Sequence, residues 1–228
     1  EERAVIDAAT QAGAGRVHLI EEPLAAAIGV GIDITQPCGS MVIDMGGGTT
    51  DIAVISLGGI VHSASIRIAG DTFDEAIIKY IRRKYNILVG ERTAEELKTK
   101  LGCVSKRPKL LAMEVRGRSL ISGLPKTLQV TSDEMYEAMS EVSGTIVDSV
   151  KNVLEETPPE LVSDISNRGI ILTGGGATMY GFGELIRSQT GIKTVIASEP
   201  DECVAQGTGK ALENISLLKT YNERRAAR

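Results

Sequence analysis

The sequence has few of the residues that mark metal-binding or membrane-spanning proteins. Its 228 residues include three cysteines, two histidines and no run of about 18 apolar residues. Cys38, Cys103 and Cys203 lie far apart at a spacing that fits no metal site, which predicts small apolar core residues in a reducing compartment. His18 and His62 lie within apolar segments, and we expect both to be structural. The sequence therefore predicts no metal-binding cluster and no transmembrane helix.

A surplus of positive charge is also missing. The 25 Lys and Arg residues are outnumbered by 30 Asp and Glu residues, which gives a formal net charge of −5. Basic residues gather in short clusters at 82–84 and 224–225, a pattern typical of a solvated helix face. Because nucleic-acid binding depends on neutralising phosphates with Lys and Arg, we expect no nucleic-acid partner.

What is present is the composition of an ordinary globular protein, with 42% hydrophobic and 24% charged residues. The length fits one large domain or two small ones. Strand-like and helix-like patterns alternate along the chain, which predicts an α/β fold. We expect strands at 17–20, 40–44, 51–57, 60–69, 169–173 and 194–197, helices at 2–13, 24–28, 72–85, 132–155, 158–166, 181–190 and 201–218, a hairpin or small meander at 112–130, and a frayed tail at 222–228.

Several helix starts carry side chains suited to capping. Thr93 is followed three residues later by Glu96, which is the pattern of a capping box. Ser132 precedes the long helix and is expected to cap it. Asp71 also suits an N-cap position, so the Gly70–Asp71 pair has two interpretations: a helix cap or part of a ligand site.

The sharpest motif is Val-Ile-Asp-Met-Gly-Gly-Gly-Thr-Thr-Asp at 42–51. An apolar strand ends at Asp44, turns through three glycines and re-enters as a strand through two threonines. Glycines have no Cβ, so several backbone N–H groups can point into one concavity that suits phosphate oxygens. Asp44 would repel a phosphate but fits a divalent cation held between the two through water. The alternative is a plain glycine hairpin with an exposed aspartate.

A second Gly-Gly-Gly turn, at 174–176, also follows directly after an apolar strand. The recurrence suggests a common use, which is to let the backbone approach a ligand closely. We expect amide hydrogens of the two turns to face the same triphosphate from opposite sides. The motif is not a P-loop, because no Gly-Lys-Ser/Thr follows it, and no G-x-G-x-x-G opens a helix.

A phosphate loop carried on a hairpin points to the superfamily of actin, sugar kinases and heat-shock chaperones. Within it, the chain resembles the MreB/Mbl family of bacterial actin-like rod shape-determining proteins. The resemblance is carried by blocks that follow the family's order along nearly the whole chain, at 21–29, 44–51, 66–71, 90–95, 157–161 and 172–176. It implies an α/β, actin-like (ribonuclease H-like) ATPase fold, with mixed sheets flanked by helices and two lobes that close on ATP and Mg²⁺.

The resemblance also implies a division of the chain into three parts. Residues 1–35 and 203–228 would be the remnant of the first lobe (subdomain IA). Residues 36–71 and 136–202 would be the core of the second lobe (subdomain IIA), and 72–135 a small inserted subdomain (IIB).

Matching positions imply roles for individual residues. Glu21 would align the water that attacks ATP, Asp44 would orient a water bound to magnesium, and Glu22 is expected to cap the helix. From Glu21 alone, the plainer interpretation is a surface carboxylate at a helix N-terminus. Nucleotide binding is implied for Gly46, Gly47, Gly48 and Thr49 in the first turn, for Gly174, Gly175, Gly176 and Ala177 in the second, and for Ala94, Glu95, Glu96, Leu97 and Lys98 in the small subdomain. A solvated helix face is the alternative for this last group.

The function that the resemblance implies is that of a cytoplasmic protein at the inner face of the cell membrane. It would assemble head to tail into filaments, hydrolyse ATP slowly, and govern rod shape by organising cell-wall synthesis with morphogenesis proteins. Two other classes stay open. A small-molecule kinase would need a second aspartate base and an acceptor pocket, and a chaperone ATPase would need a C-terminal peptide-binding domain.

The chain begins at Glu1, without a methionine and inside an expected helix. The family's first phosphate loop, Asp-x-Gly-Thr, is not found in it. We therefore expect a fragment that lacks the N-terminal part of the fold. We also expect this chain alone to bind ATP weakly and to hydrolyse it very slowly.

Overall fold

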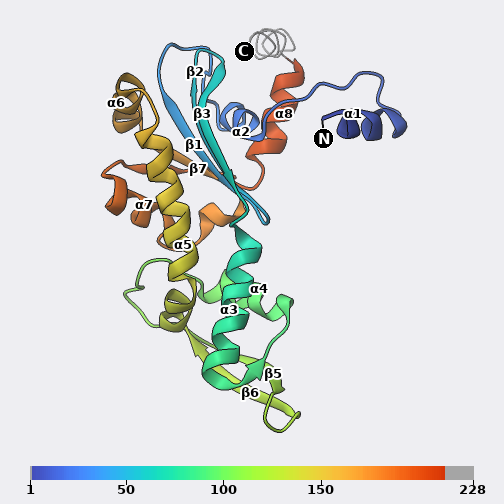
Figure 1. Cartoon of the computed structure of the whole chain (residues 1–228), viewed down its shortest axis with the longest axis vertical. Helices are drawn as coiled ribbons and strands as arrows, with labels where there is room; N and C mark the ends of the chain where they lie inside the picture. The colour runs from blue at the N-terminus through green and yellow to red at the C-terminus, as the bar shows by residue number, and fades with distance from the viewer. Residues whose placement is uncertain (1, 214–228) are drawn as a thin grey trace.

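A five-stranded sheet with the order β3-β2-β1-β7-β8 forms the centre of the molecule (Figure 1). This computed structural model describes residues 2–213. Antiparallel pairs join β1 to β2 and β2 to β3, and parallel pairs join β1 to β7 and β7 to β8. The mixed sheet flanked by helices confirms the predicted α/β class. The strands are β1 Ser40–Met45, β2 Thr50–Ser56, β3 Gly59–Ile66, β7 Ile170–Thr173 and β8 Thr194–Ile196.

Helices cover both faces of this sheet (Figure 1). One face carries α5 (Ser132–Glu155), α6 (Pro159–Arg168) and α7 (Phe182–Thr190), and the other carries α2 (Glu22–Gly29) and α8 (Cys203–Glu213). Side chains of β1 alternate between two cores: Met41 and Ile43 pack on the α5 side, and Val42 packs on the α2 side. A strand covered on both faces needs apolar residues in succession, which explains the uninterrupted run at 41–43.

Helices α2 and α8 pack at very short range. A Cβ added to Gly29 would overlap the carbonyl oxygen of Cys203, and one added to Gly207 would overlap that of Ala25. Lys210 Nζ donates to the Gly29 carbonyl oxygen at 2.7 Å. The missing Cβ of glycine therefore sets the distance between these helices. By contrast, α1 (Glu2–Gln11) has no buried residue.

A smaller lobe lies beyond one end of the central sheet (Figure 1). It contains α3 (Gly70–Tyr85), α4 (Glu91–Leu101) and a sheet with the order β4-β5-β6. The predicted hairpin is present as β5 (Ala112–Ser119) and β6 (Pro125–Thr131), and β4 (Ile87–Leu88) pairs with β5. Helix α5 runs along both lobes and returns the chain to the central sheet (Figure 1).

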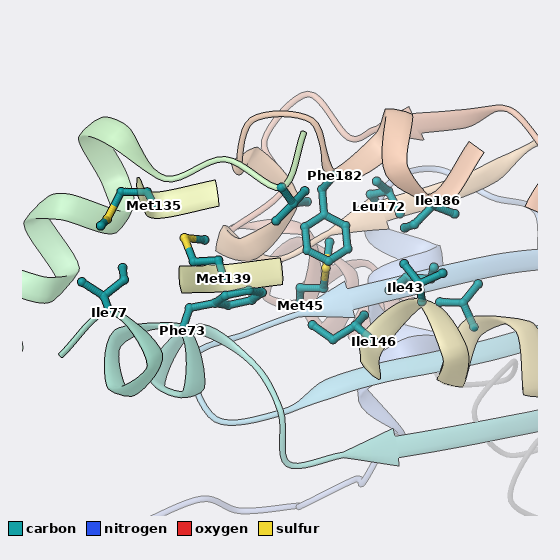
Figure 2. Packing of buried hydrophobic residues seen from close by; sticks show 14 of the residues in the cluster. Ile43, Met45, Phe73, Ile77, Met135, Met139, Ile146, Leu172, Phe182 and Ile186 are labelled. Carbon is teal, nitrogen blue, oxygen red and sulfur yellow. The ribbon is translucent and has the colours of Figure 1, made fainter. Parts of the chain in front are cut away.

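One hydrophobic core continues through both lobes. Figure 2 shows Phe73 of α3 beside Met139 of α5, and Met45 of β1 beside Phe182 of α7. Met135 and Met139 of α5 are fully buried in this core. Burying a side chain of this size contributes roughly 1.5–3 kcal/mol. The lobes are thus joined by packed side chains near the end of β1.

Two helix starts differ from the sequence prediction. Thr93 does not cap α4: the N-cap is Gly90, and the Thr93 N–H already donates to the Gly90 carbonyl oxygen at 3.0 Å. Helix α5 is capped by Thr131, one residue before Ser132. The Thr131 hydroxyl accepts the Glu134 N–H at 3.4 Å, and the Glu134 carboxylate accepts the Thr131 N–H at 2.8 Å. A capping box is present, but it lies at the start of α5 and not at the predicted start of α4.

Residues 17–20 form no strand, contrary to the sequence prediction. They pair with none of the strands among residues 2–213, and His18 is exposed. A short apolar run does not by itself distinguish a strand from an extended connection. The helix predicted for 201–218 begins at Cys203, and positions 214–218 and the predicted tail 222–228 lie outside the described residues.

The cysteines and the helices were both the subject of expectations from composition. Cys103 and Cys203 are buried, whereas Cys38 is half-buried, and all three are free thiols. Across residues 2–213, none of the helices combines the length and the apolar character needed to cross a membrane.

Candidate functional site

The glycine hairpin after β1 is fixed to the start of α3. The Gly70 N–H donates to the Gly46 carbonyl oxygen at 3.1 Å, and the Asp71 N–H donates to that of Gly47 at 2.8 Å. The Gly46 N–H closes the hairpin by donating across it at 2.9 Å. The N–H groups of Gly47 and Gly48 donate to no other group of the described chain. Two carbonyls of the hairpin therefore fix it to α3, and its exposed glycines keep two N–H groups that are not used within the described chain.

The start of α3 decides between the two interpretations of Gly70–Asp71. The N-cap residue is Ala69, whose N–H donates to the Thr72 hydroxyl at 3.3 Å. Asp71 lies inside the first turn, so the interpretation of Asp71 as the cap is wrong. Its backbone instead holds the glycine hairpin.

The second glycine turn lies directly against the first. At Gly174 φ is +79°, a conformation that favours glycine, and an added Cβ would overlap Oδ1 of Asp44. A Cβ on Gly176 would lie 2.8 Å from the Cβ of Met45. The segment Gly175–Thr178 forms a short 3₁₀ helix, η1, which the sequence did not predict. The predicted proximity of the two turns is confirmed, and exposed glycines in both show that neither is sealed beneath side chains.

The sheet topology explains why the turns meet. Strands β1 and β7 are parallel neighbours, with Asp44 opposite Thr173 at their ends. Loops that follow parallel neighbouring strands emerge at the same edge of a sheet, which is the usual place for a ligand in an α/β protein.

Asp44 is a buried carboxylate with an incomplete set of partners. The residue is 4% exposed, and its Oδ2 has no hydrogen-bond partner among residues 2–213. Burial, with smaller contributions from the charges of Glu22 and Asp51, raises the pKa of Asp44 to about 6 against an opposing hydrogen bond with Thr173. An unpaired buried carboxylate oxygen is unfavourable unless a cation or a donor approaches it.

The two glutamates before Pro23 take different positions. Glu21 is the N-cap residue of α2 and Glu22 lies in the first turn, so the prediction that Glu22 caps the helix is wrong. Desolvation and the charge of Asp51 raise the pKa of Glu22, and Glu22 in turn raises that of Asp44. The structure thus brings Glu22 within electrostatic range of Asp44. No sequence pattern indicates this, because two adjacent glutamates at a helix start look alike.

A cavity of about 550 Å³ opens beside the two turns. Its volume lies within the range of small-molecule sites. The two glycine turns, the start of α3, helix α4 with the segment after it, and η1 with the residues after it all contribute: Gly46, Gly47, Gly70, Glu95, Lys98, Thr99, Gly102, Arg107, Gly175, Gly176, Thr178, Met179 and Tyr180. Both lobes therefore line it.

Two of the five residues predicted on α4 border this cavity, Glu95 and Lys98. Lys98 Nζ donates to the Gly70 carbonyl oxygen at 3.0 Å and forms an ion pair with Asp74 at 2.7 Å. The lysine is thereby held beside the first glycine turn.

The other three residues predicted on α4 point elsewhere. Ala94 and Leu97 are fully buried in the hydrophobic core. Glu96 forms an ion pair with Lys100 at 2.5 Å on the exposed side of the helix. For Glu96 the structure therefore shows the solvated helix face that was the alternative.

The remaining predicted residues surround the cavity without lining it. Gly174, the N-cap residue of η1, and Ala177, within η1, are buried, while Gly48 is exposed and Thr49 is half-buried in the hairpin. Several lining residues carry no sequence motif and were not predicted. Thr99 lies four residues after Glu95, and Gly102 lies four residues after Lys98. This helical spacing would have identified both.

Comparison with known proteins identifies the family. The family model described as "MreB/Mbl protein" matches residues 1–220. The chain belongs to the MreB/Mbl family. The cell shape-determining protein Mbl of Bacillus cereus is 50% identical over 96% of this chain and 66% of its own length. The cell shape-determining protein MreB of Escherichia coli is 51% identical over 95% of this chain and 62% of its own length.

Solved structures agree with this MreB/Mbl assignment. Crystal structures of MreB5 of Spiroplasma citri bound to ADP and to AMPPNP both match with a TM-score of 0.92 at 41% identity, over 94% and 95% of this chain and 65% of theirs. A MamK double helical filament matches with a TM-score of 0.78 at 19% identity, which shows the fold alone. The fold is therefore actin-like, and the chain spans less than two thirds of the length of these relatives.

Proposed function

We propose that the chain is the nucleotide-binding part of a filament-forming, cell shape-determining cytoskeletal protein. One observation carries the proposal: two exposed glycine turns lie side by side at one cavity, next to a buried aspartate. The MreB5 structures, at 41% identity, hold ADP and AMPPNP, which supports ATP as the ligand here.

The phosphates would lie between the two turns. Phosphate oxygens would accept hydrogen bonds from the N–H groups of Gly47 and Gly48 on one side and of Gly175 and Gly176 on the other. Each hydrogen bond to a charged group contributes about 1.5–3 kcal/mol, so a few of them dominate the affinity of a phosphate site. Lys98 is held beside the first turn, where the ion pair with Asp74 offsets part of its positive charge.

Asp44 fits a magnesium ion better than it fits the phosphates. Its Oδ2 is buried and has no partner in the described part of the chain, and its negative charge would repel a phosphate. Mg²⁺ keeps several waters and is usually held by one or two carboxylates together with substrate phosphates. Asp44 would hold such an ion through water. When bound, the ion offsets the negative charge of the phosphates.

Slow ATP hydrolysis would be the activity of this site. Two glutamates are candidates for the residue that aligns the attacking water. Glu21 matches the family position for this role, whereas the charge of Glu22 raises the pKa of Asp44. A positioned base of this kind typically contributes 10²–10⁴-fold to a rate. The raised pKa of Glu22 makes it a better proton acceptor than an ordinary surface glutamate.

The cellular part of the proposal concerns assembly. Subunits would stack head to tail, and a contact of this kind gives open filaments unless it closes into a ring. The relatives are named cell shape-determining proteins, which supports a role in rod shape. The filament would lie at the inner face of the cell membrane and organise cell-wall synthesis with morphogenesis proteins. ATP would close the two lobes, and hydrolysis would relax them.

Light scattering of the full-length protein with and without MgATP tests this function. We expect scattering to rise with MgATP and to stay at baseline with magnesium alone. Phosphate release should be slow and should fall by about 10²-fold in Glu22→Gln, with Glu21→Gln measured in parallel to separate the two carboxylates. A protein that stays monomeric and whose ATP turnover is stimulated by a sugar would contradict the proposal and indicate a kinase.

A further inference from the structure

We propose that Asp74 limits how tightly the cavity holds a phosphate-bearing ligand, because its carboxylate offsets the charge of Lys98. The inference rests on the proposed nucleotide function. Lys98 of α4 lines the cavity, whereas Asp74 of α3 does not. The two side chains form an ion pair at 2.7 Å and are only 16% and 14% exposed. Of the ion pairs among residues 2–213, this is the one that joins α4 to another element.

Lys98 is fixed at the point where α4, the start of α3 and the first glycine turn meet. Its Nζ donates to the Gly70 carbonyl oxygen at 3.0 Å, and the Gly70 N–H donates to the carbonyl oxygen of Gly46 at 3.1 Å. A Cβ added to Gly70 would lie 3.3 Å from the Cα of Gly47 and 3.4 Å from Lys98 Nζ. The ammonium therefore lies close to the turn that would bind phosphate.

The ammonium of Lys98 keeps one donor for a ligand. A lysine ammonium has three N–H donors, and Lys98 uses one on Gly70 and one on Asp74, with no further acceptor among residues 2–213. Because Lys98 lines the cavity, the remaining donor can reach an oxygen of a bound ligand. A phosphate oxygen that accepts it would meet a cation whose charge Asp74 already offsets.

Acidic groups outnumber Lys98 at this place. Desolvation raises the pKa of Asp74 against the hydrogen bond and the charge of Lys98, and the charges of Glu95 and Asp71 raise it further. The Oδ1 atom of Asp74 is buried and has no partner in the described part of the chain. Lys98 therefore compensates the buried charge of Asp74 only in part, and such a charge is unfavourable for the fold itself. The same charge opposes an anionic ligand in the cavity.

A limited affinity would matter for nucleotide exchange. In the proposed cycle, ADP has to leave before ATP can enter. Differences in affinity between related complexes lie mostly in the rate of dissociation. Asp74 would therefore speed the release of the product while lowering the affinity for it.

A purely structural role is the rival interpretation. In that role the ion pair would only tie α4 to α3, and its loss would loosen the cavity and weaken every ligand alike. Asp74→Asn separates the two interpretations, because asparagine keeps the size of the side chain and an oxygen that accepts from Lys98, but removes the charge. Tighter binding of a phosphate-bearing ligand follows only if the charge of Asp74 opposes that ligand.

Isothermal titration calorimetry of the full-length protein with MgADP, MgAMPPNP and adenosine gives the test. Asp74→Asn should bind both nucleotides about tenfold more tightly, the size expected when one unit charge near a phosphate is removed at an effective dielectric constant of about 20. The affinity for adenosine, which has no phosphate, should stay unchanged. Release of MgADP, followed by stopped flow, should slow by about the same factor. Glu75→Gln is the matched control, because Glu75 follows Asp74 on α3, pairs with Lys79 at an exposed position and lies outside the cavity lining.

Weaker or unchanged binding of MgADP and MgAMPPNP to Asp74→Asn overturns the inference, as does an equal change for adenosine, and in both cases the proposed nucleotide function stands. An equal gain in Glu75→Gln also overturns it, because the effect would then come from net charge alone. If the unmodified protein binds neither nucleotide, the proposed function fails and this inference fails with it. Thermal unfolding shows whether each variant is folded. Asp74→Ser, which removes the charge and leaves room for a water, repeats the test if the asparagine variant is unfolded.

Discussion

At the scale of single residues, Asp44 lowers the stability of the unliganded fold but suits the binding of a cation. Its carboxylate is buried beside the exposed glycine turns, and its Oδ2 has no partner in the described chain. The ordinary pKa of 3.8 is raised to about 6, so the native state favours the protonated form. Above pH 6 the ionised carboxylate destabilises the fold, and a cation at the site would remove that penalty.

We predict that Asp44→Asn raises the stability of the unliganded protein at pH 8. Native Asp44 binds a proton as the pH falls through 6, whereas the unfolded chain does so near 3.8, so the penalty is complete above 6 and absent below about 4. The gain should be about 2 kcal/mol at pH 8, which corresponds to roughly 4–8 °C in Tm, and should vanish at pH 4. Thermal unfolding at both pH values measures it.

Asp33 provides a control of opposite sign. Its carboxylate accepts hydrogen bonds from Thr35 and Gln36, which lower its pKa. Asp33→Asn should therefore lose stability at pH 8 and lose less at low pH. A variant Asp44→Asn that is less stable than the parent at pH 8 would show that Asp44 is not a strained carboxylate.

Sequence alone identifies those site residues that form a contiguous motif. Asp44 and both glycine turns could be predicted, because a strand, an aspartate and three glycines follow one another along the chain. The relation of Glu22 to Asp44 could not, because it depends on how α2 packs beside β1. Arg107 and Tyr180 are more distant still: 73 positions separate them, and only the fold brings them together.

At the scale of elements, the contact between α2 and α8 depends on backbone approach. Gly29 and Gly207 each face a carbonyl oxygen of the other helix, and Gly209 on the same helix α8 has open space around it. The pair Gly207 and Gly209 therefore separates the effect of close packing from the general effect of glycine in a helix.

Gly207→Ala should destabilise the protein by about 3 kcal/mol, because the added methyl meets a backbone carbonyl that cannot move without shifting the helix. Gly209→Ala should instead stabilise it by roughly 0.5–1 kcal/mol, since alanine favours the helix and nothing opposes its methyl. Chemical denaturation of the two variants provides the comparison. Equal effects would mean that α8 does not pack on α2 at this distance.

The elements that the sequence predicts well are those whose apolar residues recur at a regular spacing. The hairpin at β5 and β6, helix α3 and the long helix α5 all show it, and each is present within a few residues of its predicted bounds. The errors have a different origin. A strand at 17–20 would need a partner strand that no local pattern reveals, and a cap depends on the backbone conformation of one residue, as at Gly90 and Thr131.

At the scale of the whole molecule, the cavity is shared between the lobes. The sheet lobe supplies both glycine turns, and the smaller lobe supplies α4 and the segment that carries Arg107. Phe73 and Met139 continue the core from one lobe into the other (Figure 2). A ligand that touches both walls would favour the arrangement in which the walls lie close together, and in the proposed function this would couple nucleotide binding to assembly.

In the proposed function, both glycine turns bind one triphosphate. Amide resonances of Gly47, Gly48, Gly175 and Gly176, followed by NMR while MgAMPPNP is added to the protein, test it most directly. We predict that all four shift along the same saturation curve, because one ligand contacts both turns. Shifts confined to one turn, or no shift at saturating nucleotide, would contradict the account.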